Sequence, residues 1–217
     1  MTRNEEVLDP PTSAAAPAAT KVSAALRGGI LLPPPNMQGG KPLMECLIAR
    51  RSVRSYSARA LQPQVLSDLL WAAFGVNRPA SDGRTAPYWR HVLLIDVYVA
   101  SADGVWLYEP RSHSLSPYQT LDLRAQTGHQ DFVAFAPLNL IYVAHAERMS
   151  DIPAEERRLY ASVDAAFIGQ NVYLFCASEG LGTVFRGAVD CENLARALSL
   201  GPGQMVTFAQ TVGYPQN

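Results

Sequence analysis

The chain has few cysteines and no long hydrophobic run. Its three cysteines (Cys46, Cys176 and Cys191) are spaced neither like a disulfide framework nor like a zinc site, and such usage is typical of a reducing compartment. No apolar stretch reaches membrane-spanning length. Pro17 interrupts the alanine-rich run near the N-terminus, which makes a poor secretory signal. We therefore expect a cytoplasmic protein.

An excess of charge of one sign and several common motifs are also missing. The net charge is -1, so no overall field favours nucleic acid or an anionic membrane as a partner. The chain contains no G-x-G-x-x-G fingerprint, Walker A loop, G-x-S-x-G elbow or H-E-x-x-H pair. Each of its histidines (His91, His113, His129 and His145) lacks a second ligand at metal spacing, so we predict no metal site.

The composition that remains suits one folded domain behind an arm. Hydrophobic residues make up 48% and charged residues 17%, which is typical of a globular protein with a sizeable core. Residues 1–40 are rich in proline and alanine and predict an extended or mobile N-terminal arm, whose apolar residues 30–32 could lie over a partner. The globular domain is expected to cover residues 41–217.

Periodicity predicts a mixture of helices and strands in this domain. Helices are expected from Pro42 to residue 49, from Pro63 to Phe74, and from Asp190, as its cap, to Leu198. Strands are expected over residues 91–100, 105–108, 138–144 and 204–212, the first two joined by a turn at 102–104. Because the helices and strands do not alternate strictly, the predicted class is α+β.

The longest helical pattern runs from Pro153 to Glu179, and Gly180 is expected to end it. Its second half is apolar over most of the circumference, so it should be buried on most sides. We expect a central helix, a subunit interface, or both.

An arginine-rich segment follows the first predicted helix. Arg50, Arg51, Ser52 and Arg54 fall within five residues, whereas Lys21 and Lys41 are the only lysines of the chain. In an extended segment Arg50, Ser52 and Arg54 share one face. Guanidinium groups bind phosphate or carboxylate oxygens two at a time, so the segment could hold a phosphorylated, hydroxyl-rich ligand. The alternative interpretation is a solvated basic loop.

Two later segments also carry chemistry. Residues 84–91 lead from a loop into a predicted strand and contain two arginines, a tyrosine and a tryptophan. Between Gly180 and Gly187 two glycines bound a short extended run, which lets backbone approach a flat ligand closely. The alternative is that Gly180 only ends a helix and Gly187 only permits a turn.

These segments, in this order, resemble the nitroreductase-like flavoprotein family. The resemblance covers about residues 41–215 and includes residues 70–79, residues 171–181 and the closing Gly213, Tyr214 and Pro215. It is strongest to the branch that contains the azoline dehydrogenases of peptide-modifying clusters and their stand-alone relatives.

The resemblance implies an FMN enzyme with a central, mostly antiparallel sheet flanked by helices. It implies an intimate homodimer with the flavins at the subunit interface. The phosphate, ribityl chain and pyrimidine edge of FMN would be held by Arg50, Arg51, Ser52 and Arg54. The backbone of Val184, Phe185, Arg186 and Gly187 would lie against the isoalloxazine and place an amide near N5.

The resemblance also implies a ping-pong reaction. NAD(P)H would give a hydride to the flavin and leave, after which a small electrophilic or conjugated organic substrate would take the electrons. A guanidinium near N1 and C2=O would stabilise the reduced flavin. The absence of a Rossmann fingerprint is compatible with this, because the nicotinamide binds only transiently.

The sequence departs from the family pattern at two places. Relatives carry a Pro-Ser-x-x-Asn-x-Gln type run where residues 87–93 read Pro-Tyr-Trp-Arg-His-Val-Leu, so His91 and Leu93 replace flavin-binding amides. His91 could still donate to a flavin carbonyl, and Tyr88 and His91 are the candidate proton donors. The sequence also ends without a basic tail, which leaves the phosphate to the arginines of residues 50–54, with help from Arg186.

Two alternative functions stay open. One is a flavin-dependent dehydrogenase that oxidises azoline or peptide-derived substrates, with oxygen as the acceptor. The other is a diverged binding or partner subunit without redox activity.

Overall fold

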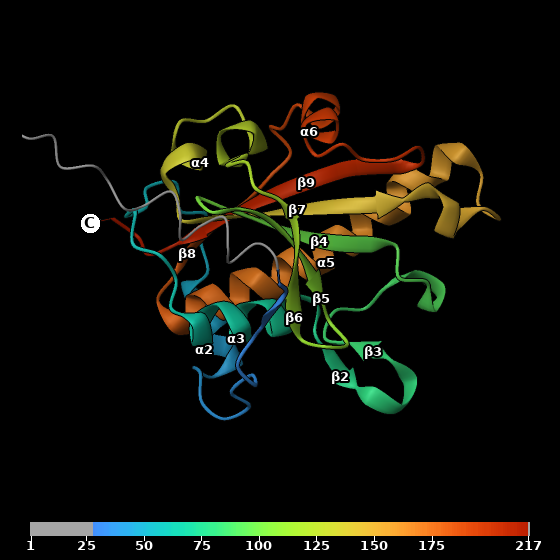
Figure 1. Cartoon of the computed structure of the whole chain (residues 1–217). Coiled ribbons are helices and arrows are strands. Elements are labelled where there is room, and N and C mark those ends of the chain that lie inside the picture. The colour runs from blue at the N-terminus through green and yellow to red at the C-terminus, as the bar shows by residue number, and fades with distance from the viewer. Residues whose placement is uncertain (1–27, 217) are drawn as a thin grey trace, which may run out of the picture.

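The computed structural model describes residues 28–216, which form an α+β unit around a seven-stranded sheet (Figure 1). The strand order is β1-β6-β5-β4-β7-β9-β8, and all neighbouring strands are antiparallel. The predicted class and the flanked antiparallel sheet are therefore confirmed. The strands are β1 (Ile30–Leu31), β4 (Ile95–Ser101), β5 (Gly104–Glu109), β6 (Ser114–Gln119), β7 (Leu138–His145), β8 (Gly182–Arg186) and β9 (Gln204–Gly213).

Helices cover both faces of the sheet. In Figure 1, α2 (Leu43–Ala49), α3 (Pro63–Phe74) and α5 (Ala154–Glu179) lie below it, and α4 (Phe132–Phe135) and α6 (Cys191–Ala197) lie above. All eight residues of β7 are buried. Its side chains alternate between two cores, with Leu140 on the α5 side and Ile141 on the α6 side. The short 3₁₀ helices are Pro79–Ser81, Trp89–His91, Arg124–Thr127 and Ala146–Met149.

The long helix α5 buries one face rather than most of its circumference. Ala161, Ala165 and Ile168 are fully buried, but Leu159 and Phe167 are 60% and 44% exposed. The predicted long central helix is confirmed, because α5 packs on the sheet, α2, α3 and the Trp89 loop, and the side that carries Phe167 stays uncovered in one subunit. Gly180 ends α5 in the left-handed conformation, with φ of 70°.

The folded unit begins before Lys41. Ile30 and Leu31 pair with Leu115 and Ser114 of β6, so β1 covers that edge of the sheet. Ser67 of α3 donates to the Pro33 carbonyl at 2.6 Å. Residues 30–34 are therefore extended and fixed on this domain, while residues 1–27 of the predicted arm lie outside the described part of the chain.

The predicted strand at 91–100 begins four residues later than expected. Arg90 and His91 have φ of 45° and 60°, and this left-handed backbone cannot continue a strand. Before it, residues 83–84 (β3, Gly83–Arg84) pair with β2 (Val76–Arg78) in a short ribbon that periodicity did not predict.

Within residues 28–216, no helix combines the length and apolarity that a bilayer span requires. The same range holds no group of three or more histidine, cysteine or acidic side chains placed to bind a metal ion.

Candidate functional site

The arginine segment lies directly against β8. Ser52 and Thr183 form a parallel bridge, and the Val53 N–H donates to the Thr183 carbonyl at 2.9 Å. Tyr56, 6% exposed, anchors the segment, because its hydroxyl donates to the Val53 carbonyl. Two of the three segments that sequence analysis selected therefore meet within one chain.

Tyr173 of α5 connects these two segments. Its hydroxyl accepts the Phe185 N–H at 3.0 Å and shares a 2.8 Å hydrogen bond with Ser52 Oγ. The Arg50 guanidinium lies 5.2 Å from the centre of the Tyr173 ring, within cation–π range. The sequence did not indicate Tyr173 as a site residue, because a tyrosine in an apolar helical pattern is expected to be part of the hydrophobic core.

A cavity of about 400 Å³ opens beside this contact. Its lining includes Arg50, Arg51, Tyr173 and Thr183. The side chains of Arg50, Arg51 and Arg54 are exposed, and among residues 28–216 no carboxylate lies within ion-pairing distance of them. The positive charge of the segment is thus available to an anionic ligand.

A backbone donor just after β8 has no partner among residues 28–216. The Phe185 N–H is taken by Tyr173, and Val184 pairs with Thr211 of β9. The exposed Gly187 N–H, in contrast, donates to no described residue. Of the four residues predicted to lie against the isoalloxazine, Gly187 therefore has the amide best able to reach a ligand.

The Arg186 side chain forms hydrogen bonds inside the protein instead. It is 4% exposed and donates to the Thr127 carbonyl at 2.6 Å and to Asn139 Oδ1 at 3.2 Å. Burial lowers the pKa of Arg186 to about 10. The expectation that this guanidinium helps to hold a phosphate is wrong, since its donors point into the protein.

Tyr88 and His91 lie elsewhere in the subunit. Their rings contact each other edge to face at 5.9 Å, and His91 lines a different cavity, with Phe74 and Arg84. Within one chain, neither residue joins the arginine segment and β8. Tyr88 and His91 of one chain could therefore act only on a ligand that is bound by the arginine segment and β8 of a second copy of the chain.

Asp164 of α5 holds the loop that carries these residues. The Trp89 N–H donates to both of its carboxylate oxygens, at 3.1 and 3.2 Å, and the side chain is 2% exposed. Burial raises the pKa of Asp164 to about 6. Sequence reasoning missed Asp164, because nothing in its own helix indicates that a loop 75 residues earlier packs on it.

The chain belongs to the nitroreductase family, whose model matches residues 47–214. The nitroreductase homologue MJ1384 of Methanocaldococcus jannaschii is 37% identical over 160 residues, which are 67% of this chain and 78% of that protein. A crystal structure of a nitroreductase homologue from Ralstonia eutropha is 42% identical, with a TM-score of 0.84, over 87% of this chain and 90% of that one.

Two more distant structures share the fold. The NADPH:FMN oxidoreductase of Vibrio harveyi, complexed with NAD+, is 20% identical with a TM-score of 0.60, over 81% of this chain and 69% of that one. A chain of the Escherichia coli microcin synthetase McbBCD complex is 17% identical with a TM-score of 0.68, over 95% of this chain and 85% of that one. The predicted family is confirmed, and with it oxidoreductase activity as the general class.

Proposed function

We propose that the protein is a cytoplasmic, homodimeric, FMN-dependent oxidoreductase. When bound, FMN supplies two-electron chemistry between NAD(P)H and a small electrophilic or conjugated organic substrate. The observation that carries the proposal is the meeting of the arginine segment with β8 through Ser52, Thr183 and Tyr173. Membership of the nitroreductase family and the fold shared with an NADPH:FMN oxidoreductase support it.

The residues present fit the phosphorylated part of such a cofactor. Arg50 and Arg51 line an open cavity, and the exposed guanidinium groups of Arg50, Arg51 and Arg54 have no carboxylate partner among residues 28–216. They would bind the phosphate through charge-assisted hydrogen bonds, and Ser52 would orient the hydroxyl chain. The Gly187 amide would hold the ring edge.

A second copy of the chain would complete this site. Exposed apolar side chains cluster on α2 and α5, where Ile48 is 83% and Met44 66% exposed. Apolar surface of this extent on two packed helices marks an interface. Together with the separation of His91 from the arginine segment, it supports a dimer in which one subunit supplies residues 50–54 and the other supplies His91.

The flavin assignment is tested with the purified full-length protein. A yellow protein whose flavin absorbance is bleached by NADH or NADPH is the expected result. A yellow protein indifferent to both nicotinamides would favour the dehydrogenase alternative. A colourless protein that takes up no added FMN would contradict the proposal and favour a binding subunit.

The arginine segment is tested by Arg51→Ala combined with Arg54→Ala. Each lost charge-assisted hydrogen bond is worth about 1.5–3 kcal/mol, so the double variant should lose its flavin without unfolding. Flavin content by absorbance and circular dichroism are the measurements. The matched control is Arg196→Ala, an exposed arginine of α6, which should retain flavin.

A further inference from the structure

A second cavity, of about 600 Å³, lies away from the arginine segment. Its apolar wall comes from β4 and β5, with Ile95, Val97 and Leu107, and its polar wall includes Arg84, Arg111 and Arg148. Within one chain it shares no lining residue with the cavity beside Arg50, but its lining includes His91, which the proposed function places at the flavin held by a second copy. The volume is within the range of small-molecule sites.

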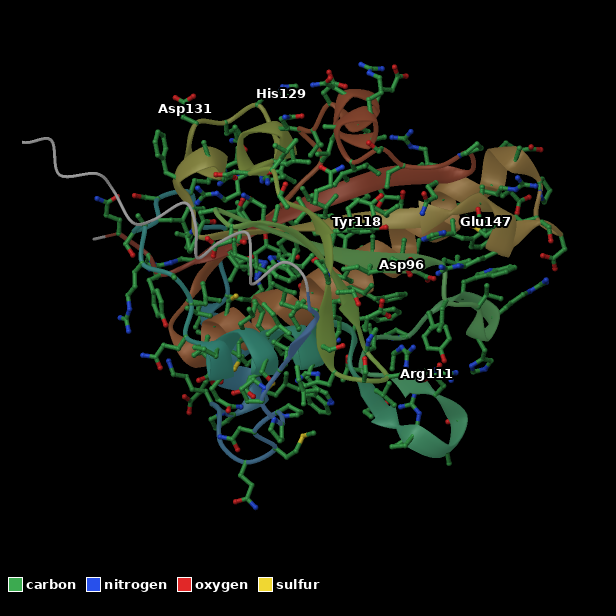
Figure 2. The ribbon with its side chains drawn as sticks, in the orientation of Figure 1. Asp96, Arg111, Tyr118, His129, Asp131 and Glu147 are labelled. Atoms are coloured by element: carbon green, nitrogen blue, oxygen red, sulfur yellow. The ribbon has the colours of Figure 1, made fainter. Side chains whose placement is uncertain are left out.

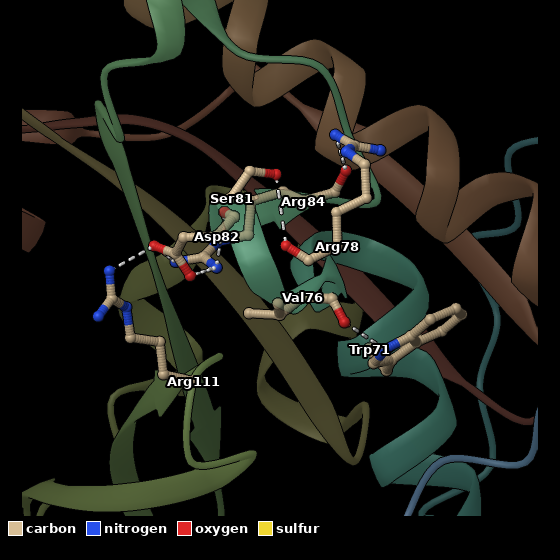
Figure 3. A network of polar contacts seen from close by, with 7 residues as sticks. All are labelled: Trp71, Val76, Arg78, Ser81, Asp82, Arg84 and Arg111. Carbon is tan, nitrogen blue, oxygen red and sulfur yellow. Dashed lines mark hydrogen bonds and ion pairs between the residues drawn. The ribbon is translucent and has the colours of Figure 1, made fainter.

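Arg84 lines this wall, and one edge of its guanidinium pairs with no described residue. It is 4% exposed and binds Asp82 end-on, with Nη1 to Oδ1 at 2.6 Å and Nη2 to Oδ2 at 3.3 Å (Figure 3). Its buried Nε has no hydrogen-bond partner among the described residues. A guanidinium has five N–H donors, so end-on pairing leaves the side edge, formed by Nε and the second N–H of Nη2. An unpaired buried donor is costly unless a ligand satisfies it.

Arg111 adds a second cation to the same carboxylate. Its Nη2 donates to Asp82 Oδ2 at 2.9 Å from the turn between β5 and β6 (Figure 3). Although burial works against it, the hydrogen bonds from Arg84 and Arg111 hold the pKa of Asp82 below its usual value. One carboxylate thus serves two guanidiniums, which leaves a surplus positive charge.

The cavity wall holds another carboxylate, Asp96, which Figure 2 shows on β4, in the same half of the molecule as Arg111. Arg148 donates to both Asp96 oxygens, at 3.0 and 3.2 Å, and His145 Nε2 lies 2.7 Å from Oδ2. Burial lowers the pKa of His145, but the bonds to Asp96 and Glu147 raise it overall, and His145 Nδ1 lies 2.9 Å from Glu147 Oε1, so His145 is shared between two carboxylates. Glu109 is the remaining acid in the wall, and no cation pairs with it among residues 28–216.

We propose that this cavity binds a small organic monocarboxylate with an apolar body, held by Arg84 and Arg111. The guanidinium edge matches the two oxygens of a carboxylate, and β4 and β5 supply the apolar surface for the rest of the ligand. The ligand's negative charge would lie at the local excess of positive charge beside Asp82, although Asp82, Asp96 and Glu109 balance the three arginines over the whole wall. Glu109 disfavours a dianion such as phosphate.

The test is calorimetric titration of the full chain with 3-phenylpropanoate and with its neutral isostere, 3-phenylpropanamide. The carboxylate should bind at least tenfold more tightly than the amide. Arg111→Gln should weaken carboxylate binding at least tenfold, and Arg196→Gln should leave it unchanged. Glu109→Gln should tighten it, because a repelling charge is removed.

Arg111 is the main probe because its side chain is 77% exposed, so its replacement does not threaten folding. Arg84→Met is added, with circular dichroism to establish that it folds. Equal binding of amide and carboxylate, equal competition by inorganic phosphate, or carboxylate binding unaffected by Arg111→Gln would overturn the proposal. Flavin absorbance recorded for each variant shows separately whether the site at Arg50 is intact.

Discussion

At the scale of single residues, Tyr173 joins three parts of the chain through one hydroxyl. The oxygen accepts the Phe185 N–H and shares a second hydrogen bond with Ser52 Oγ. The residue therefore stabilises the fold and positions the arginine segment, and these roles can be separated by experiment.

Tyr173→Phe should lower the free energy of unfolding by about 1–3 kcal/mol, because it leaves the Phe185 N–H unpaired. It should also weaken flavin retention, since Ser52 loses its partner. Urea unfolding and flavin absorbance are the measurements. Tyr160→Phe is the control, because Tyr160 lies on the same helix and its hydroxyl bonds to no described residue; an equal loss in both variants would contradict the role of the Tyr173 hydroxyl.

Asp164 makes stability depend on pH in an unusual direction. Its pKa is raised to about 6 by burial, so the folded state favours the protonated carboxyl. Below pH of about 4 the carboxyl is protonated in the folded and unfolded states alike and no penalty exists. As pH rises through 6, ionisation of the buried group destabilises the fold.

Asp164→Asn should therefore stabilise the protein at pH 7.5, on the order of 2–3 kcal/mol, because the amide oxygen can still accept from Trp89 without a buried charge. The gain should shrink towards zero near pH 4. Unfolding by urea at both pH values measures it. The exposed Asp151→Asn should change little, and a destabilised Asp164→Asn at pH 7.5 would show that the ionised carboxylate is needed.

At the scale of elements, β8 packs closely on α5 where Gly169 of the helix faces the ring of Phe185. A Cβ on Gly169 would lie 2.5 Å from Cδ2 of Phe185, whose ring stacks on Tyr142. The ring is held on both sides, since Phe208 lies 4.7 Å away from it. The contact therefore fixes how closely the strand approaches the helix.

Gly169→Ala should lower the free energy of unfolding by about 1–3 kcal/mol through overpacking. Gly187→Ala is the matched control, because its Cβ would meet Phe208 only at an ordinary 3.5 Å. Thermal unfolding of both variants checks the difference. Equal melting temperatures for Gly169→Ala and the parent chain would mean that Phe185 can move.

Periodicity predicted the elements whose signal is local. The bounds of α3 and the ends of α5 and β9 agree with prediction to within a residue. The helix ends are predictable because helix-terminating glycines, Gly75 and Gly180, can be recognised in the sequence. β6 was missed because Pro117 interrupts it, at a place where β5 is irregular. β1 was missed because only its partner β6 makes it a strand.

The same distinction applies to the site. The arginine segment and β8 carry chemistry in their own composition, so both could be selected from the sequence. Tyr173 and Asp164 act through partners 121 and 75 residues away, and neither partner is visible before the fold is known. The orientation of Arg186 depends likewise on Thr127 and Asn139, which is why its predicted role in phosphate binding was wrong.

At the scale of the whole molecule, the exposed apolar surface of α2 and α5 is the interface expected in the proposed dimer. Ile48→Asp should convert the proposed dimer to a monomer, because a charge at an 83% exposed apolar position cannot be buried in an interface without a partner. Light scattering after size exclusion measures the mass. Leu121→Asp, at an exposed residue outside both helices, should remain dimeric; a dimer in both variants would exclude this surface as the interface.

At both edges of the sheet, a short segment that is distant in sequence covers the neighbouring strand. Residues 30–31 shield β6, and Ser52 with Val53 shields the outer side of β8. An uncovered strand invites a neighbouring molecule to add to the sheet. An anion held by Arg50 and Arg51 would stabilise the segment that covers β8. The protein with an occupied site should therefore resist aggregation better than the protein with an empty site.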